Sequence, residues 1–256
     1  MMKRNYKLVL ITLLLAFASC SFTTKKFEDP NKDKLLIQLI KYVLEEGHFS
    51  PQEINDDFSE EVFYDYLNQL DPFKRYFYAS DIKEFEKYKD QIDDQLISYD
   101  LTFFNLTHER LLKRIEDSKE VYKSVLSKPF DFYEDETFST DYENLDYVSS
   151  KKDMKERWRK QLKFSTIANY DDLVAQREFD IDQVNYTPAL EDGENQDAYI
   201  KTKNLNEAQD NSNKSDLELE KEARETTEKA IDELYDFIDD RQRKDWFGEY
   251  INAIVE

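Results

Sequence analysis

The side chains that could bind a metal ion or transfer a proton are few in this chain. His48 and His108 are the only histidines among its 256 residues. Neither has a cysteine or another histidine at the spacing that zinc sites use. We therefore interpret His108 as a residue on a helix surface, and we expect no zinc site and no cofactor.

A crowded acidic segment is the other candidate for metal binding. Its carboxylates are Asp131, Asp135, Glu136 and Asp141. Such oxygen ligands suit calcium, but the segment lacks the glycine and the ligand rhythm of an EF-hand loop. We interpret acidic pairs elsewhere, such as Asp239-Asp240, as solvated helix faces. The sequence therefore predicts no metal site and no catalytic residue in this chain.

Glycine is rare, with three residues in the whole chain, at positions 47, 193 and 248. Phosphate-binding loops, oxyanion turns and nucleophile elbows depend on backbone shapes that glycine supplies. The sequence therefore excludes a P-loop, a dinucleotide-binding turn and a G-x-S-x-G motif. Few glycines and prolines, together with many charged residues, Leu, Tyr and Phe, predict an all-α fold.

The formal net charge is −21, and it becomes −24 without the basic residues Lys3, Arg4 and Lys7 of the leader. This charge disfavours binding to nucleic acid and electrostatic docking on anionic lipid. Solubility is its simplest role, and attraction of a basic partner is the alternative.

The first residues have the pattern of a secretory signal. A basic start is followed by an apolar run from Leu8 to Ala18 that is too short to span a bilayer. Ala16-Phe17-Ala18 would direct cleavage before Ser19, whereas Phe17-Ala18-Ser19-Cys20 is close to a lipobox, and both interpretations stay open. Cys20, the only cysteine, is the candidate for lipidation, so no intrachain disulfide is expected. We expect a location in a bacterial cell envelope.

Apolar spacing predicts a helical hairpin between Phe58 and Phe85. We predict Ser59 as the N-cap of its first helix and Pro72 as its end. Asp81 and Glu84 are predicted to cap a second helix that reaches about Ile97. The aromatic residues between the two helices are Phe73, Tyr76, Phe77 and Tyr78.

The same spacing predicts further helices along the chain. They run from Asp33 to Glu46, about Leu101 to Ser127, Asp153 to about Phe164, Asp171 to Phe179, and onward from Asp216. A turn-rich acidic loop is predicted over residues 130–147. The last apolar stripe, Trp246 to Ile254, has no cap after it, so we expect a marginal, exposed C-terminal helix.

We therefore expect one irregular multi-helix domain interrupted by a disordered acidic insertion. The predicted division is a signal peptide over 1–19, a tether over 20–31, a helical domain over 32–179, the insertion over 180–215 and a helical continuation over 216–256.

Three blocks of sequence follow one another in a recognisable order. They are Phe58 to Phe85, with its Leu-Asp-Pro and Arg-Tyr-Phe groups, Lys128 to Phe132 with Trp158 to Phe164, and Asp245 to Ala253. Together they resemble the N-terminal helical domain of the tail-specific, or carboxy-terminal-processing, serine proteases of bacterial envelopes. The insertion departs from the family's pattern.

The resemblance implies a non-catalytic part of a larger enzyme. In the family, a PDZ domain that recognises carboxy-terminal tails and a protease domain with a serine nucleophile and a lysine base follow the last helix. Some members dock a helical-repeat lipoprotein adaptor. No serine here matches the catalytic motif, so we expect a scaffold and docking role, in a chain truncated before those domains.

The docking-surface candidates are Phe73, Arg75, Tyr76 and Tyr78. Packing of these residues in the core of the hairpin is the alternative. For the whole chain, the alternative is a stand-alone envelope lipoprotein that serves as a binding module.

Overall fold

The computed structural model describes residues 30–47, 53–185, 211 and 213–255, and it divides the chain into two units, residues 1–51 and 52–256. No strand occurs in these described ranges, so the prediction of an all-α fold is confirmed. In the first unit, α2 (Pro30–Tyr42) continues into a π-helical turn (Val43–Gly47), close to the predicted helix. The predicted signal peptide, Cys20 and His48 lie outside the described residues.

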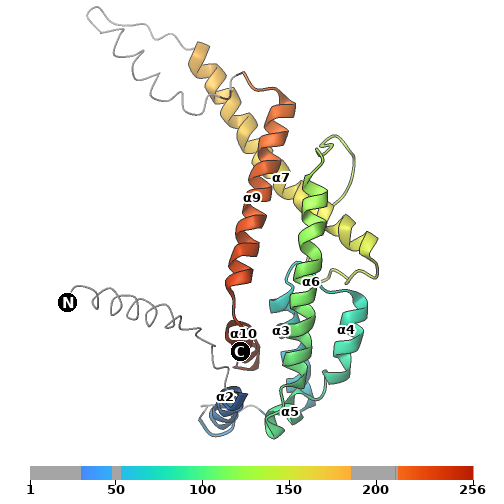
Figure 1. The fold of residues 1–256 in the computed structure, drawn as a ribbon, viewed down its shortest axis with the longest axis vertical. Coiled ribbons are helices and arrows are strands. Elements are labelled where there is room, and N and C mark those ends of the chain that lie inside the picture. The colour runs from blue at the N-terminus through green and yellow to red at the C-terminus, as the bar shows by residue number, and fades with distance from the viewer. Residues whose placement is uncertain (1–29, 48–52, 186–210, 212, 256) are drawn as a thin grey trace, which may run out of the picture. The chain divides into compact units, whose positions relative to one another are not determined.

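The second unit contains the other helices (Figure 1). In chain order they are α3 (Asp56–Leu70), α4 (Ala79–Phe85), a 3-10 turn (Glu86–Tyr88), α5 (Ile92–Ser98), α6 (Thr102–Leu126), α7 (Lys151–Asn185), α9 (Asp216–Asp240) and α10 (Arg243–Val255). The long α7 and α9 lie side by side with opposite directions, and α6 packs against both of them. The shorter helices α3, α4 and α10 gather around the first half of α6. We keep the name acidic loop for residues 130–147, which lie in the non-helical connection between α6 and α7.

An aromatic cluster forms the core where α3, α6 and α10 meet. Tyr250 of α10 packs its ring 4.9 Å from Tyr66 of α3 and 5.7 Å from Phe104 of α6, measured between ring centroids. Phe247 lies 5.0 Å from Phe104 in the same way. The expectation that this stripe is exposed is therefore wrong, because α3 and α6 cover it. The marginal stability expected of this helix stays a prediction.

The start of α3 differs from the predicted one for a tertiary reason. The helix begins at Asp56, and Asn55 is its N-cap, accepting a hydrogen bond from Phe58 N at 3.0 Å. Ser59 is fully buried instead. Its hydroxyl donates to Asp93 Oδ1 at 2.8 Å and accepts from Asp93 N at 2.9 Å. Ser59 thus satisfies an orphan amide at the start of α5, a helix distant in sequence.

Two other predicted boundaries change. The predicted helices at Asp153–Phe164 and Asp171–Phe179 are one continuous helix, α7, which runs on to Asn185 and so includes the first residues assigned to the insertion. The rest of the predicted insertion lies largely outside the described residues. The second hairpin helix is broken after Phe85 rather than continuous to Ile97.

The prediction for α6 agrees with the structure, and so does the start of α9. There Ser215 and Glu218 form a capping box around the first turn.

Candidate functional site

A buried carboxylate organises the segment between α3 and α4, residues 71–78, which we call the aromatic corner. Asp71 has no exposed surface, and its Oδ1 accepts a hydrogen bond from Arg75 N at 2.8 Å. Its Oδ2 accepts from Tyr76 N at 3.0 Å and Phe77 N at 2.9 Å. Burial raises the pKa of Asp71, and the three amides oppose that rise. The turn is tight enough to hold Lys74 in the left-handed region at φ 50°.

One face of α7 holds the other side of the corner. Gln161 Nε2 donates to Phe73 O at 2.9 Å, Arg157 Nη1 to Lys74 O at 2.7 Å, and Trp158 Nε1 to Arg75 O at 3.0 Å. Positions 157, 158 and 161 lie on one side of a helix, so a single helix face satisfies three consecutive carbonyls. Trp158 itself is fully buried. We call this arrangement the carbonyl clamp.

The four residues predicted as a docking surface differ in exposure. Phe73 is 42% exposed, whereas Tyr76 is 7% exposed and belongs to the core. The Arg75 guanidinium is half-buried and lies 4.8 Å from the ring centroid of Trp158 and 5.1 Å from that of Phe73. Tyr78 is half-buried beneath the guanidinium of Arg114 at 4.6 Å. Phe73 is therefore the member that a partner would meet first.

A second buried carboxylate, Asp81, fixes α4 against α6. Its Oδ2 accepts from Tyr78 N at 3.0 Å, so it caps α4 as an acid in the first turn. The helix begins at Ala79, two residues before the predicted start at Asp81. Arg114 donates two hydrogen bonds to it, each 2.8 Å long, and Arg110 contacts it closely as well. Burial would raise the pKa of Asp81, but the hydrogen bonds from Arg114, Tyr78 N and Arg110 hold it below its usual value.

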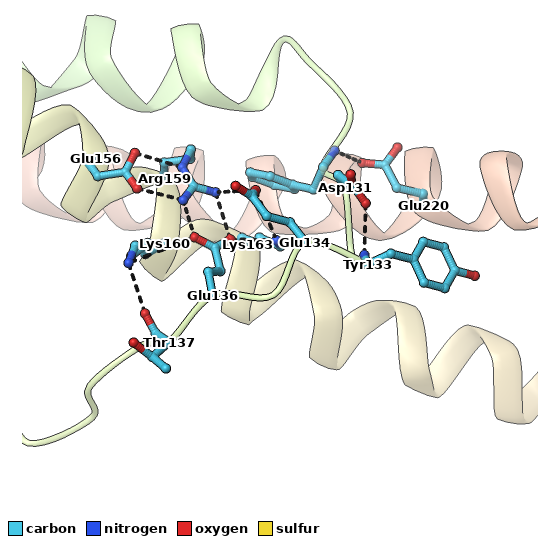
Figure 2. A network of polar contacts seen from close by, with 11 residues as sticks. Asp131, Tyr133, Glu134, Glu136, Thr137, Glu156, Arg159, Lys160, Lys163 and Glu220 are labelled. Atoms are coloured by element: carbon cyan, nitrogen blue, oxygen red, sulfur yellow. Dashed lines mark hydrogen bonds and ion pairs between the residues drawn. The ribbon is translucent and has the colours of Figure 1, made fainter.

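Glu136 attaches the acidic loop to α7 (Figure 2). Its Oε1 accepts from Arg159 at 3.0 Å and from Lys163 at 2.6 Å, and Lys160 donates to the carbonyl of Thr137 at 3.0 Å. The hydrogen bond from Arg159 and the nearby Lys163 lower the pKa of Glu136 to about 2, against the opposing effect of burial. At the start of the loop, Phe130 N donates to Glu220 of α9 at 2.9 Å.

Several of the residues considered for metal binding make other contacts in the structure. Glu136 is engaged by two cations of α7, and Asp131 accepts a hydrogen bond from Tyr133 N at 2.9 Å. No group of residues able to hold a metal ion occurs within the described part of the chain. His108 stacks on Phe104 with ring centroids 5.6 Å apart and lies 6.4 Å from Trp246, so it belongs to the α6–α10 contact.

The clusters around Asp71, Asp81 and Glu136 have the same structural role. Each joins two elements of the domain through carboxylates, guanidinium groups or backbone carbonyls. Sequence reasoning missed Asp71, Arg157 and Gln161 as members of the corner. The sequence signals available were Asp71-Pro72 and the block that begins at Trp158. Neither signal shows that side chains of the later block donate hydrogen bonds to the backbone next to Asp71.

The chain matches the family described as tail specific protease N-terminal domain over residues 40–256. This match covers most of its length. The chain belongs to this family. It is also 28% identical, over 121 residues, to the tail-specific protease of Haemophilus influenzae. That alignment covers 47% of this chain and 17% of the relative, so the chain spans much less than the relative's full length.

The structure gives the tail-specific protease resemblance a physical basis. The first and second sequence blocks meet in the carbonyl clamp, and the third block supplies the buried face of α10. The blocks on which the resemblance rests thus contain residues that hold the domain together.

Proposed function

We propose that this chain is a non-catalytic helical scaffold and docking domain of a cell-envelope tail-specific serine endopeptidase. The observation that carries the proposal is the carbonyl clamp. It holds the aromatic corner against α7 through three hydrogen bonds and leaves Phe73 at the surface. The Asp71 carboxylate and the carbonyls of residues 73–75 are hydrogen-bonded within the domain, which supports a structural role for the corner.

In the parent protein, a PDZ domain would bind the carboxy-terminal tails of protein substrates, and a protease domain would cleave the chain. The helical domain would frame that protease and offer a surface to a partner such as a helical-repeat lipoprotein adaptor. These roles are implied by the family and are part of the proposal.

Hydrolysis is the direct test. The purified chain is incubated with an unstructured tail peptide, and cleavage is followed by mass spectrometry. We expect no cleavage. Cleavage that serine-directed inhibitors abolish would contradict the non-catalytic role.

Localisation is a separate part of the proposal. Lipidation of Cys20 would hold the chain at a membrane, since two or more acyl chains anchor a protein stably. None of the described helices is long and apolar enough to cross a bilayer. The intact mass of protein extracted from membranes tests the anchor, and an unmodified N-terminus at Ser19 would rule it out.

One observation favours a second candidate, a stand-alone envelope lipoprotein that acts as a binding module. The apolar face of α10 is buried against α3 and α6, so this helix packs within the domain itself. Reading the gene beyond codon 256 distinguishes the candidates. A following glycine-rich PDZ segment supports the protease, and a stop codon there supports the module.

A further inference from the structure

A row of aromatic rings crosses the surface from the aromatic corner to the middle of α7. Phe73 contacts Tyr142 with ring centroids 5.1 Å apart, Tyr142 contacts Phe138 at 6.2 Å, and Phe138 contacts Phe164 at 5.3 Å. Both ends of the row are open to solvent, since Phe73 is 42% and Phe164 53% exposed. We call these four residues the aromatic ladder.

The ladder continues along the solvent side of α7. Ile167 is 39% exposed, and Ala168 beside it is exposed as well. Positions 164, 167 and 168 share one helix face. Rings and aliphatic side chains from three parts of the chain therefore form one apolar strip. Contiguous exposed strips of this kind are typical of protein interaction sites, whereas single exposed apolar residues are ordinary.

Three acidic side chains lie beside the ladder. Asp141 and Glu143 flank Tyr142, and Asp171 lies one turn beyond Ile167. All three are exposed, and none forms an ion pair within the described residues. Among the nearby cations, Arg75 lies 5.1 Å from the ring centroid of Phe73, and Lys163 pairs with Glu136. Lys160 donates to the carbonyl of Thr137.

An apolar strip flanked by exposed acids indicates which kind of partner would bind there. We propose that the aromatic ladder is a docking surface for a cationic amphipathic segment of another protein, with an apolar row flanked by Lys or Arg. The apolar row would cover the rings, and its cations would face Asp141, Glu143 and Asp171. A second copy of this chain fits poorly, because its ladder would bring the same acids against these. The inference gives a location to the docking role proposed above and rests on that role.

The test uses the full chain and three fluorescent peptides, with binding followed by anisotropy. One peptide carries Leu and Lys at helical spacing, the second replaces every Leu with Ser, and the third replaces every Lys with Glu. We expect saturable binding of the Leu–Lys peptide alone at low micromolar concentration. Equal binding of the Leu–Lys and Ser–Lys peptides would overturn the inference, because it would mean general attraction to an acidic protein. Absence of saturable binding of the Leu–Lys peptide would overturn it too.

Matched variants locate the surface. We expect Phe164→Ala to weaken binding of the Leu–Lys peptide by about tenfold, which is the loss typical of a central interface anchor. Phe237→Ala removes another exposed phenylalanine, 64% exposed on α9, and is expected to change binding by less than about twofold. Ile167→Lys adds a cation beside the ladder and should weaken binding at least as much as Phe164→Ala. Equal losses for Phe164→Ala and Phe237→Ala would overturn the location.

Two readouts separate the possible failures. Sedimentation velocity that shows a dimer broken by Phe164→Ala would overturn the choice of a cationic partner in favour of a second copy. Peptide hydrolysis by the chain would contradict the proposed function but leave the ladder's binding data intact. Loss of ladder binding with no hydrolysis would overturn only the inference about the ladder.

Discussion

Helix α7 holds two neighbouring segments in two different ways. It binds the aromatic corner through hydrogen bonds to backbone carbonyls next to a fully buried tryptophan. It binds the acidic loop through ion pairs between Glu136 and the cations Arg159 and Lys163. The first attachment depends on packing and directional donors, whereas the second depends on charge at the surface. The corner should therefore resist salt and acid, and the loop should respond to both.

Trp158→Ala is the change that should damage the corner most. It removes the largest fully buried side chain and the donor to Arg75 O. We expect the free energy of unfolding to fall by about 3–5 kcal/mol, as for large-to-small changes in other cores. Urea denaturation followed by far-UV circular dichroism measures it. A loss below about 1 kcal/mol would show that the corner does not depend on α7.

Asp71→Asn tests the inner half of the corner. The change keeps the shape of the side chain but removes one of the two oxygens that accept the three amides. We expect a loss of about 1–3 kcal/mol in the free energy of unfolding, because buried amides are left without an acceptor. Asp141→Asn in the acidic loop is the control, since that side chain is exposed, and it should have little effect.

Glu136→Gln tests the charged attachment of the loop. At about pH 7 we expect a loss of about 0.5–1 kcal/mol, because ion pairs near the surface stabilise proteins only modestly. The pKa of Glu136 is lowered from 4.5 to about 2, so the folded state binds this proton less tightly than the unfolded state. Its stabilisation is therefore complete above the unfolded pKa and is lost as the pH falls toward 2. Denaturation curves across that range should show wild type and variant converging, and a constant difference would contradict the ion-pair account.

Salt is expected to change the free energy of unfolding the least of these tests. It should weaken the ion-paired attachment of the acidic loop but not the attachment of the aromatic corner. At about 1 M NaCl the screening length is about 3 Å, so the difference between wild type and Glu136→Gln should shrink by about half or more. The difference between wild type and Trp158→Phe, which removes the indole donor together with part of a buried ring, should stay unchanged, because neither loss involves a pair of charges. If both differences shrink together, the contrast between the two attachments is wrong.

Much of the fold follows from local pattern. The helices α6 and α9 were predictable because each has a long apolar face, and the capping box at Ser215 marks where α9 begins. The errors arose where a distant residue decides a local feature. Ser59 has the chemistry of an N-cap, but Asp93 engages it, and α3 begins earlier. The stripe of α10 seemed to lack a neighbour because Tyr66 and Phe104 lie far away in sequence.

The candidate site was predicted only in part. Phe73 and Tyr78 could be recognised as corner residues from the cluster of rings between two helices. The positive φ of Lys74 and the donors from Arg157 and Gln161 were not visible, because they depend on backbone geometry and on a helix more than eighty positions away. The ladder could not be predicted either, since Phe138 and Phe164 become neighbours only when the acidic loop lies along α7.

The carbonyl clamp also orders the events of folding. Its donors and acceptors are separated by 83 to 88 positions, whereas the three amides bound by Asp71 lie within six residues of it. Short-range contacts form first, because closing a long loop costs more chain entropy. On the ribosome, the Asp71 turn can therefore take shape before α7 has been synthesised. The carbonyls of residues 73–75 remain hydrated until Trp158 and its neighbours on α7 arrive, and α9 and α10 follow later to complete the core.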